Sequence, residues 1–360
     1  MEKFAFLIHP IGIDDIYRKY KGLKLLPETF VERLASRISP SEVSHITNLC
    51  SPYNQAEGWF IGLPLTTRMM TVLPEKKVID KIIEAGKVAE KKGAKILGLG
   101  AHTSVVGDAG VTIAENLNIA VTTGNSYTVA AAYEATKDAL RLLGRKIEDS
   151  EVTIVGANGS IGRVCAELAC RDSKKLTLVG TNLDKLEGVK DNLKKKYEEV
   201  DIECTIDLRK GMRNADAVIT VTSSIEEIIY PEDIKSGAVV CDVARPRDVS
   251  KRVKDMRNDV LVIEGGVIQV PEEVEFNFNF GFPPKQAYAC MAETMILALE
   301  KRYDNFSLGR DIHIEKVDEI NKLAKKHGFK LAGFRSFERV VNEEYIDEVL
   351  MNMRLAQEVK

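Results

Sequence analysis

Three glycines at regular spacing form the clearest chemical signal in this sequence. They follow the apolar run 152–155, stand three residues apart, and precede a helical pattern. Glycines permit a tight turn and let backbone N–H groups approach a pyrophosphate, which would also face the positive end of the helix dipole. A simple packing turn is the alternative, but the strand–turn–helix context favours a dinucleotide site. The residues expected at this site are Gly156, Asn158, Gly159, Ser160, Ile161 and Gly162.

The end of the next expected strand bears on the choice between NAD(H) and NADP(H). NAD enzymes usually carry an acidic residue at this strand tip, where it binds the ribose 2′-hydroxyl. Here the tip carries Thr181 and Asn182, with Lys185 close behind. Because hydroxyl, amide and ammonium groups can bind a 2′-phosphate, these residues favour NADP(H) over NAD(H). Two later strand ends are expected to border the nicotinamide through Thr222, Ser223 and Gly266, although the Gly265–Gly266 pair also suits an ordinary turn.

The glycine turn lies within a series of short strands that alternate with helical segments. Such alternation predicts an α/β fold with a parallel, doubly wound sheet. We expect two lobes: an N-terminal α/β substrate domain (1–145) and an NADP-binding Rossmann domain (146–283), after which C-terminal helices (284–360) return to the substrate domain and extend beyond it. The expected strands of the Rossmann domain are 151–155, 176–179, 202–205, 217–221, 238–242 and 260–264.

Helical periodicity predicts helices over 75–92 and 127–143, and a third over 284–302 with Pro284 in its first turn. The first 75 residues form a mixed region punctuated by prolines. The segment 275–282 alternates aromatic and polar residues, which predicts an extended stretch with one face buried. The functional alternative is that its phenylalanines line an apolar tunnel.

Composition narrows the classes of protein to which the chain can belong. With 44% hydrophobic and 29% charged residues, the composition is not that of a disordered chain. The net charge of −3 gives no overall positive charge that would attract nucleic acid. We find no signal-peptide pattern and no uninterrupted apolar run of about 18 residues, so no transmembrane segment is expected. The six cysteines and five histidines are scattered without metal-ligand spacing, which predicts no metal site and reduced thiols in the cytoplasm.

One cysteine occupies a suggestive sequence. Cys290 lies in the alanine-rich segment 286–293, where spacing alone favours core packing. This segment, the glycine turn and three further stretches, 99–104, 122–128 and 305–310, together resemble the long-chain fatty acyl-ACP reductases best known from cyanobacteria, which make fatty aldehydes. At Ala101 and His102 the chain departs from that family, which has a second glycine and an aromatic residue there. The resemblance spans about residues 90 to 330 and is weak over the first 75.

The resemblance implies that Cys290 is the nucleophile of an NADPH-dependent reduction of acyl-ACP or acyl-CoA to an aldehyde. A thiolate would attack the thioester, so some group must lower the thiol pKa from its usual value of about 8.5. Lys285, the helix N-terminus and the nicotinamide are candidates, whereas an ionised Glu293 would raise it. Donors for the oxyanions, or else capping residues of a hinge, are Thr103, Ser104, Thr123, Asn125 and Ser126. His102 could act as an acid, but packing is the favoured role.

The expected partner is acyl carrier protein or a coenzyme A thioester, with transient membrane contact for aldehyde release left open. An acidic carrier would dock on basic residues, and runs at 91–92, 174–175 and 194–196 are available, although each also suits a solvated helix face. Two alternatives remain open. One is a small amino or hydroxy acid dehydrogenase on a shikimate-dehydrogenase-like architecture. The other is a non-enzymatic module that binds NADP(H) and an acyl carrier. The oligomeric state is not predicted.

Overall fold

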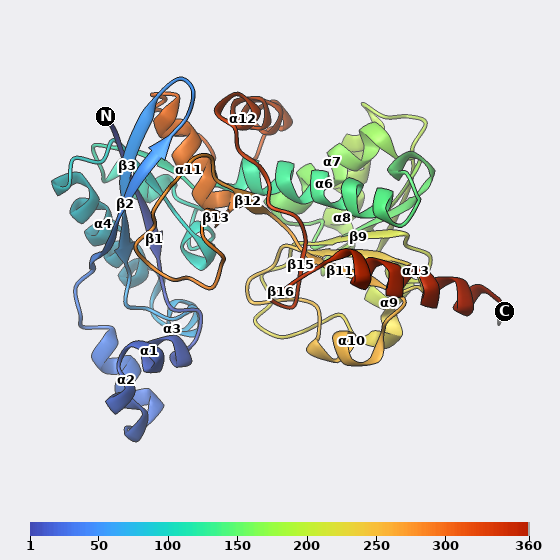
Figure 1. Cartoon of the computed structure of the whole chain (residues 1–360), viewed down its shortest axis with the longest axis horizontal. Coiled ribbons are helices and arrows are strands. Elements are labelled where there is room, and N and C mark those ends of the chain that lie inside the picture. The colour runs from blue at the N-terminus through green and yellow to red at the C-terminus, as the bar shows by residue number, and fades with distance from the viewer. Residues whose placement is uncertain (359–360) are drawn as a thin grey trace. The chain divides into compact units, whose positions relative to one another are not determined.

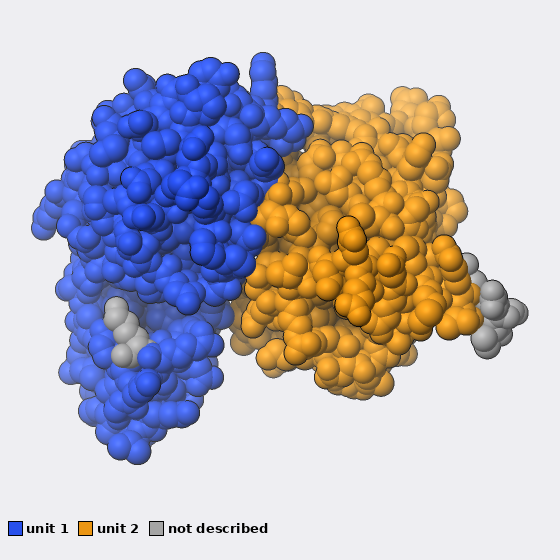
Figure 2. Space-filling model, in the orientation of Figure 1, with its two compact units in different colours: residues 1–127, 268–311, 319–330 blue, residues 128–267, 312–318, 331–360 orange. Residues whose placement is uncertain are grey.

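The computed structural model describes residues 1–358, which form two compact units (Figure 1). The first unit contains residues 1–127, 268–311 and 319–330, and the second contains residues 128–267, 312–318 and 331–360 (Figure 2). The chain therefore passes between the units more than once. The functional domain limits expected at 145/146 and 283/284 remain predictions.

A five-stranded sheet in the order β2-β3-β1-β4-β5 forms the centre of the first unit. Strand β1 pairs in parallel with β3 and β4, and β4 in parallel with β5, whereas β2 runs antiparallel to β3. Residues Phe4–Leu7 of β1 are all apolar and buried, as expected for a strand covered on both faces. The strands are β1 (Glu2–Ile8), β2 (Ser41–Cys50), β3 (Gln55–Gly62), β4 (Ile96–Gly98) and β5 (Ala120–Thr122).

Helices cover this sheet. On one face Val78, Ile82 and Ala85 of α4 join the core that includes Leu7. Helix α11 packs against β1 and β4, and it comes so close that a Cβ on Gly98 would lie 2.1 Å from Thr294 Oγ1. The helical elements of this unit are α1 (Ile13–Lys19), η1 (Lys21–Leu25), α2 (Glu28–Ala35), α3 (Thr67–Val72), α4 (Glu75–Lys91), η2 (Ala101–Ser104), α5 (Val111–Glu115) and α11 (Ala289–Leu299).

The second unit contains a six-stranded sheet in the order β11-β10-β9-β6-β7-β8, with all neighbours parallel. The strand order reverses beside β6, which is the doubly wound arrangement, so the predicted α/β fold class is confirmed. The strands are β6 (Glu151–Val155), β7 (Lys175–Val179), β8 (Asp201–Thr205), β9 (Ala217–Thr220), β10 (Val239–Asp242) and β11 (Leu261–Glu264).

The remaining elements complete the second unit and the connections. The helical elements of the second unit are η3 (Ile147–Asp149), α7 (Ser160–Asp172), α8 (Leu183–Lys194), α9 (Leu208–Met212), η4 (Pro231–Asp233), α10 (Lys251–Met256) and α13 (Glu343–Glu358). Its hairpin is formed by β15 (Arg335–Ser336) and β16 (Arg339–Val340). The other elements are α6 (Asn125–Leu142), α12 (Ile314–His327), β12 (Val267–Gln269), β13 (Gln286–Tyr288) and β14 (Lys330–Leu331).

One expectation about secondary structure was wrong, and one pair of strands was missed. The helix predicted over 284–302 begins only at Ala289, because Lys285 has a positive φ of 64° and the short strand β13 follows it. The mixed, proline-punctuated region contains the β2–β3 hairpin, whose strands were not predicted. Across residues 1–358, no helix combines the length and apolar character needed to cross a membrane.

Candidate functional site

The carboxyl ends of three parallel strands meet at one edge of the first unit's sheet. His9 follows β1, His102 follows β4, and Gly124 follows β5. Ligands of α/β proteins commonly bind at such an edge. Cys290 belongs to the first turn of α11, and Gly124 lies so close to it that a Cβ on this glycine would stand 2.4 Å from the Cys290 Cα. The cysteine singled out from sequence therefore lies against one of these strand-end loops.

Cys290 differs from the rest of its helix in exposure. Every other residue of α11 is buried, whereas Cys290 is half-buried. Core packing explains the other residues of this helix but not the partial exposure of Cys290 at its N-terminal turn. We therefore treat Cys290 as the centre of the candidate site.

The thiol of Cys290 is protonated at neutral pH. Burial raises its pKa to about 12, and the nearby Glu293 carboxylate raises it as well. Backbone N–H groups of Met291, Cys290 and Ala101 lower the pKa without reversing the shift. The expectation that a neighbouring group holds this pKa below its usual value is therefore wrong for the protein without ligands. Lys285 does not supply the missing charge, since its Nζ lies 2.5 Å from Glu273 Oε1 in an ion pair.

A buried carboxylate lies one helical turn beyond the cysteine. Glu293 accepts hydrogen bonds from Thr122 Oγ1 (2.5 Å), from the Tyr127 backbone N–H (2.8 Å) and from Ser307 Oγ (2.8 Å). Ser307 also interacts with the Ser126 hydroxyl at 2.7 Å. This network fixes α11 against the loop after β5, and so it holds Cys290 beside Gly124. Sequence reasoning considered Glu293 only for its charge and missed this positioning role.

The five predicted oxyanion donors are all buried near this edge. Thr103 Oγ1 donates to the Gly100 carbonyl and Ser104 Oγ donates to the Ala101 carbonyl, so both close the turn η2. Thr123 Oγ1 donates to the Ser307 carbonyl at 2.6 Å. Their hydroxyl protons are therefore engaged, as in the capping alternative. No hydrogen bond joins the Asn125 side chain to another residue within the described 1–358, so its amide is the donor best able to meet a ligand.

His9 fixes the turn that carries Ala101 and His102. Its Nδ1 lies 2.9 Å from the Pro10 carbonyl, and its Nε2 accepts from the His102 backbone N–H at 3.2 Å. Burial lowers the pKa of His9 to about 4, so the ring is neutral and can fill both roles. Burial also lowers the pKa of His102. Sequence reasoning did not select His9, although its position directly after a buried strand was visible.

The glycine turn of the second unit has the close contacts that a dinucleotide site requires. Gly156 has a φ of +89°, and a Cβ there would lie 3.1 Å from the Val221 backbone. A Cβ on Gly162 would lie 2.3 Å from the Gly156 carbonyl oxygen. These contacts bring the turn onto the start of α7, whose first backbone N–H groups at Ser160 and Ile161 have no partner within the helix. The donor set and the cradle fit a pyrophosphate.

Replacement of Gly162 by alanine tests this cradle. The added Cβ would force the turn apart, because it meets backbone rather than a flexible side chain. We expect the affinity for NADPH, measured by fluorescence titration, to fall by at least about a hundredfold, or roughly 3 kcal/mol. Gly188→Ala is the control, since Gly188 has no atom within 4 Å of its Cβ position. Equal binding by both variants would contradict a role for this turn.

The tip of β7 is organised by two asparagines. Asn158 Oδ1 accepts from the Thr181 N–H at 3.1 Å, and Asn158 Nδ2 donates to the Asn182 carbonyl at 3.2 Å. Asn182 Oδ1 caps α8 by accepting from the Lys185 N–H at 2.9 Å. Asn158 and Asn182, both predicted to contact the cofactor, therefore stabilise the loop through their own side chains. The side chains of Thr181 and Lys185 are exposed and remain available to a phosphate.

Two buried aspartates lie beyond the neighbouring strand ends. Asp248 accepts from Thr222 Oγ1 (2.5 Å) and from its backbone N–H (3.1 Å), so the predicted contact Thr222 is held from beneath. Ser223 is exposed, and Gly266 turns the chain after β11 with a φ of +78°. Asp242 ends β10 and accepts from the Val249 N–H at 3.0 Å. Burial raises the pKa of Asp248, and it raises that of Asp242 to about 6.

This raised pKa predicts a pH-dependent stability. Asp242 titrates near pH 4 when unfolded and near pH 6 when folded, so the folded state binds more protons between these values. The stability contribution is complete below about pH 4 and is lost as the pH rises through 6. We expect Asp242→Asn to abolish a decline of about 3 kcal/mol in the free energy of unfolding, measured by urea titration with circular dichroism. The exposed Asp255→Asn is the control, and an unchanged decline in Asp242→Asn would contradict the assignment.

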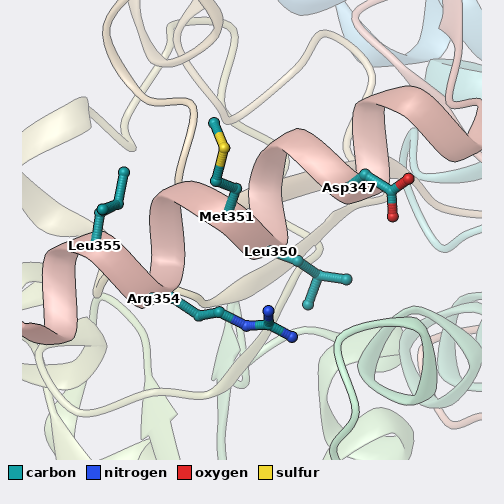
Figure 3. A pocket seen from close by; sticks show the side chains of 5 residues that line it. All are labelled: Asp347, Leu350, Met351, Arg354 and Leu355. Atoms are coloured by element: carbon teal, nitrogen blue, oxygen red, sulfur yellow. The ribbon is translucent and has the colours of Figure 1, made fainter.

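A shallow hollow on the C-terminal helix contains none of the site residues. It is lined by Asp347, Leu350, Met351, Arg354 and Leu355. Figure 3 shows Met351 and Leu355 on one side of α13, with Arg354 pointing to the other. The hollow has no thiol, histidine or hydroxyl group, so it offers no chemistry of its own.

The second unit belongs to a recognisable class of fold. Residues 137–264 match the family model described as Shikimate / quinate 5-dehydrogenase. The matched residues include the glycine turn and the strands β6 to β11. A quinate dehydrogenase from Corynebacterium glutamicum, solved with NAD, aligns over 90% of this chain and 99% of its own, with 11% identity and a TM-score of 0.41. The family-model match over residues 137–264 and the turn geometry together indicate a dinucleotide-binding fold of the dehydrogenase type.

Two curated relatives match most of the chain. The long-chain acyl-[acyl-carrier-protein] reductase of Synechococcus elongatus is 27% identical over 317 residues, which cover 82% of this chain and 88% of the relative. The aminotransferase PigE of a Serratia species is 30% identical over 360 residues, which cover 96% of this chain. The chain spans 41% of the length of that second relative. The predicted resemblance to acyl-ACP reductases is therefore found across both units, within a wider set of relatives.

Proposed function

We propose that the chain is an NADPH-dependent reductase that converts a long-chain acyl thioester into a fatty aldehyde through an acyl group on Cys290. The observation that carries this proposal is the position of Cys290 in the first turn of α11, where it is the one residue of intermediate exposure in an otherwise buried helix. A residue that served core packing alone needs no exposed surface, whereas a substrate must be able to reach a nucleophile. The similarity of the Synechococcus relative, a long-chain acyl-ACP reductase, over 82% of this chain supports the proposal.

The chemistry divides into two steps at one sulfur atom. The Cys290 sulfur bonds to the thioester carbonyl carbon, the bond to the carrier sulfur breaks, and the proton of Cys290 passes to the departing thiol. NADPH held by the glycine turn would supply the hydride, whose two electrons would reduce the acyl group. The bond between sulfur and carbon then breaks, the aldehyde leaves, and the Cys290 thiolate takes up a proton from water. The N–H groups of Met291 and Ala101 stabilise negative charge at the sulfur during both steps.

The other residues act by binding and positioning. Glu293 fixes α11 to the loop after β5, and His9 fixes the turn that carries Ala101. Thr181 and Lys185 select NADP(H) by binding its 2′-phosphate at the tip of β7. The carrier is acyl carrier protein or coenzyme A. The six free thiols suit a reducing cytoplasm.

The proposed product also fits the Serratia relative. An aldehyde is an amino acceptor for transamination, so a reductase segment within a longer aminotransferase would supply the carbonyl that the other part consumes. The match to the shikimate/quinate dehydrogenase family supports a second candidate, the oxidation of a small hydroxy acid. That reaction transfers hydride directly to NADP⁺ and needs no nucleophile.

One experiment separates these candidates. Purified protein is incubated with NADPH and a panel of acyl-ACPs and acyl-CoAs, and aldehydes are measured by gas chromatography. A parallel arm contains NADP⁺ or NAD⁺ with shikimate, quinate and small amino or hydroxy acids. Aldehyde in the first arm supports the reductase. NAD(P)H formed only in the second arm would replace it with the dehydrogenase, and binding of NADPH without turnover in either arm would leave a binding module.

A further inference from the structure

The phenylalanine segment 275–282 is fixed along the antiparallel edge strand β2. Ser44 Oγ donates to the Phe276 carbonyl at 2.9 Å, and Asn277 Nδ2 donates to the His45 carbonyl at 2.9 Å. Thr47 and Glu275 form an isolated antiparallel bridge. Asn277 has a positive φ of 49°, so the segment bends there and is not a plain extended strand. These contacts along β2 set the position of the segment.

The rings form one connected path that starts in the core of the first unit. Phe60 of β3 is fully buried, and the ring centroids of Phe276, Phe278 and Phe280 lie 6.0, 6.1 and 5.6 Å from its own. Phe280 lies 5.8 Å from Phe282. The path is therefore continuous and apolar, and Phe280 is its central ring.

Exposure along this path is greatest at Phe278 and stays partial from Phe280 onward. Phe276 is 8% exposed, Phe278 is 38% exposed, and Phe280 and Phe282 are intermediate. The Phe282 ring then lies 4.5 Å from Tyr288, which caps α11 two residues before Cys290. A segment that served only to close the core would bury these rings. Instead, a partly open aromatic strip ends at the turn that carries the thiol.

The polar side chains next to the phenylalanines form hydrogen bonds of their own. Asn277 binds the His45 carbonyl, and Asn279 Oδ1 accepts from the Gly281 N–H at 2.9 Å. Glu275 pairs with the Thr47 hydroxyl at 3.3 Å. Because the intervening side chains are engaged with backbone or with one another, the strip suits a long ligand without polar groups.

We propose that this aromatic strip, Phe278, Phe280, Phe282 and Tyr288, binds the hydrocarbon tail of the acyl group whose carbonyl carbon reacts at Cys290. The proposal rests on the proposed function and adds the position and class of its substrate: an unbranched, long acyl chain. Continuity between the strip and the first turn of α11 commits it to this occupant. A short acyl group attached at Cys290 covers less of the strip than a long one.

The test compares acylation of Cys290 by palmitoyl-CoA and by hexanoyl-CoA, without NADPH, followed by intact-protein mass spectrometry. We expect Phe278→Ser and Phe280→Ala each to slow acylation by palmitoyl-CoA by about tenfold, since less apolar surface covers the tail. Acylation by hexanoyl-CoA stays within about twofold of the unmodified chain. Phe30→Ser is the matched control, because Phe30 lies 53% exposed on α2 outside the strip.

Every outcome of this experiment either supports or overturns the proposed tail site. Equal slowing for both thioesters, or none for palmitoyl-CoA, would overturn the strip as the tail site while leaving acylation at Cys290 intact. If no thioester acylates the unmodified chain, the proposed function fails, and the strip is then judged by fluorescence binding of cis-parinaric acid. Weaker binding by Phe278→Ser than by Phe30→Ser would support an apolar chain site, and equal binding would overturn it.

Discussion

Replacement of Cys290 by alanine is expected to abolish aldehyde formation. Without the sulfur no acyl group can be held, and hydride transfer has no acyl-enzyme to reduce, so the rate falls by at least about a thousandfold. The measurement is aldehyde by gas chromatography with the best acyl thioester, together with the mass of the protein after incubation without NADPH. The unmodified chain gains the mass of one acyl group, and Cys290→Ala gains none.

Cys50 provides the matched control for this prediction. It is the other half-buried thiol of the first unit and lies at the end of β2. Cys50→Ala is expected to keep both acylation and aldehyde formation, and both variants are expected to bind NADPH as tightly as the unmodified chain, because the glycine turn is untouched. Aldehyde production by Cys290→Ala at a normal rate would refute the covalent route, and full NADPH binding would exclude unfolding as the cause of any loss.

The raised pKa of the thiol makes the surroundings of Cys290 part of the proposed reaction. Burial and the Glu293 carboxylate favour the neutral thiol, whereas the N–H groups at the start of α11 favour the thiolate. In the proposed reaction the sulfur therefore loses its proton as its bond to the acyl carbon forms.

Local patterns predicted most of the second unit. Strand, glycine turn and helix follow one another within 151–172, and the contacts that require a glycine at Gly162 come from the same turn. The β2–β3 hairpin escaped prediction because its strands carry mixed polar residues and a register shift, so no clean alternation marks them. The start of α11 was misplaced because the positive φ of Lys285 leaves no trace in side-chain type.

The candidate site could be predicted only in part, because its residues come from separate segments of the chain. Cys290 was found through a continuous motif, and the pair Thr103 and Ser104 through another. The role of Glu293 depends on partners at Thr122 and Ser307, which are distant in sequence and meet only in the folded unit. The sequence marks such residues as polar and does not say which of them touch.

Gly124→Ala is expected to be the most damaging substitution outside the cysteine itself. The added Cβ would lie 2.4 Å from both Cα and Cβ of Cys290 and 2.8 Å from its carbonyl oxygen, so α11 must shift. Gly124 also has a φ of +75°, which a residue with a Cβ adopts only with strain. We expect a loss of about 3 kcal/mol in the free energy of unfolding, measured by urea titration, and at least about a hundredfold slower acylation of Cys290.

Gly144→Ala separates strain from contact. Gly144 has a nearly identical φ of +73°, but no atom lies within 4 Å of its Cβ position. This variant is expected to lose only about 1 kcal/mol and to acylate normally, because it bears the backbone cost alone. If Gly124→Ala were no more damaging than Gly144→Ala, the loop after β5 would not hold the cysteine. If instead Gly124→Ala lost stability like Gly144→Ala but acylated far more slowly, the contact would govern the position of the thiol rather than the fold.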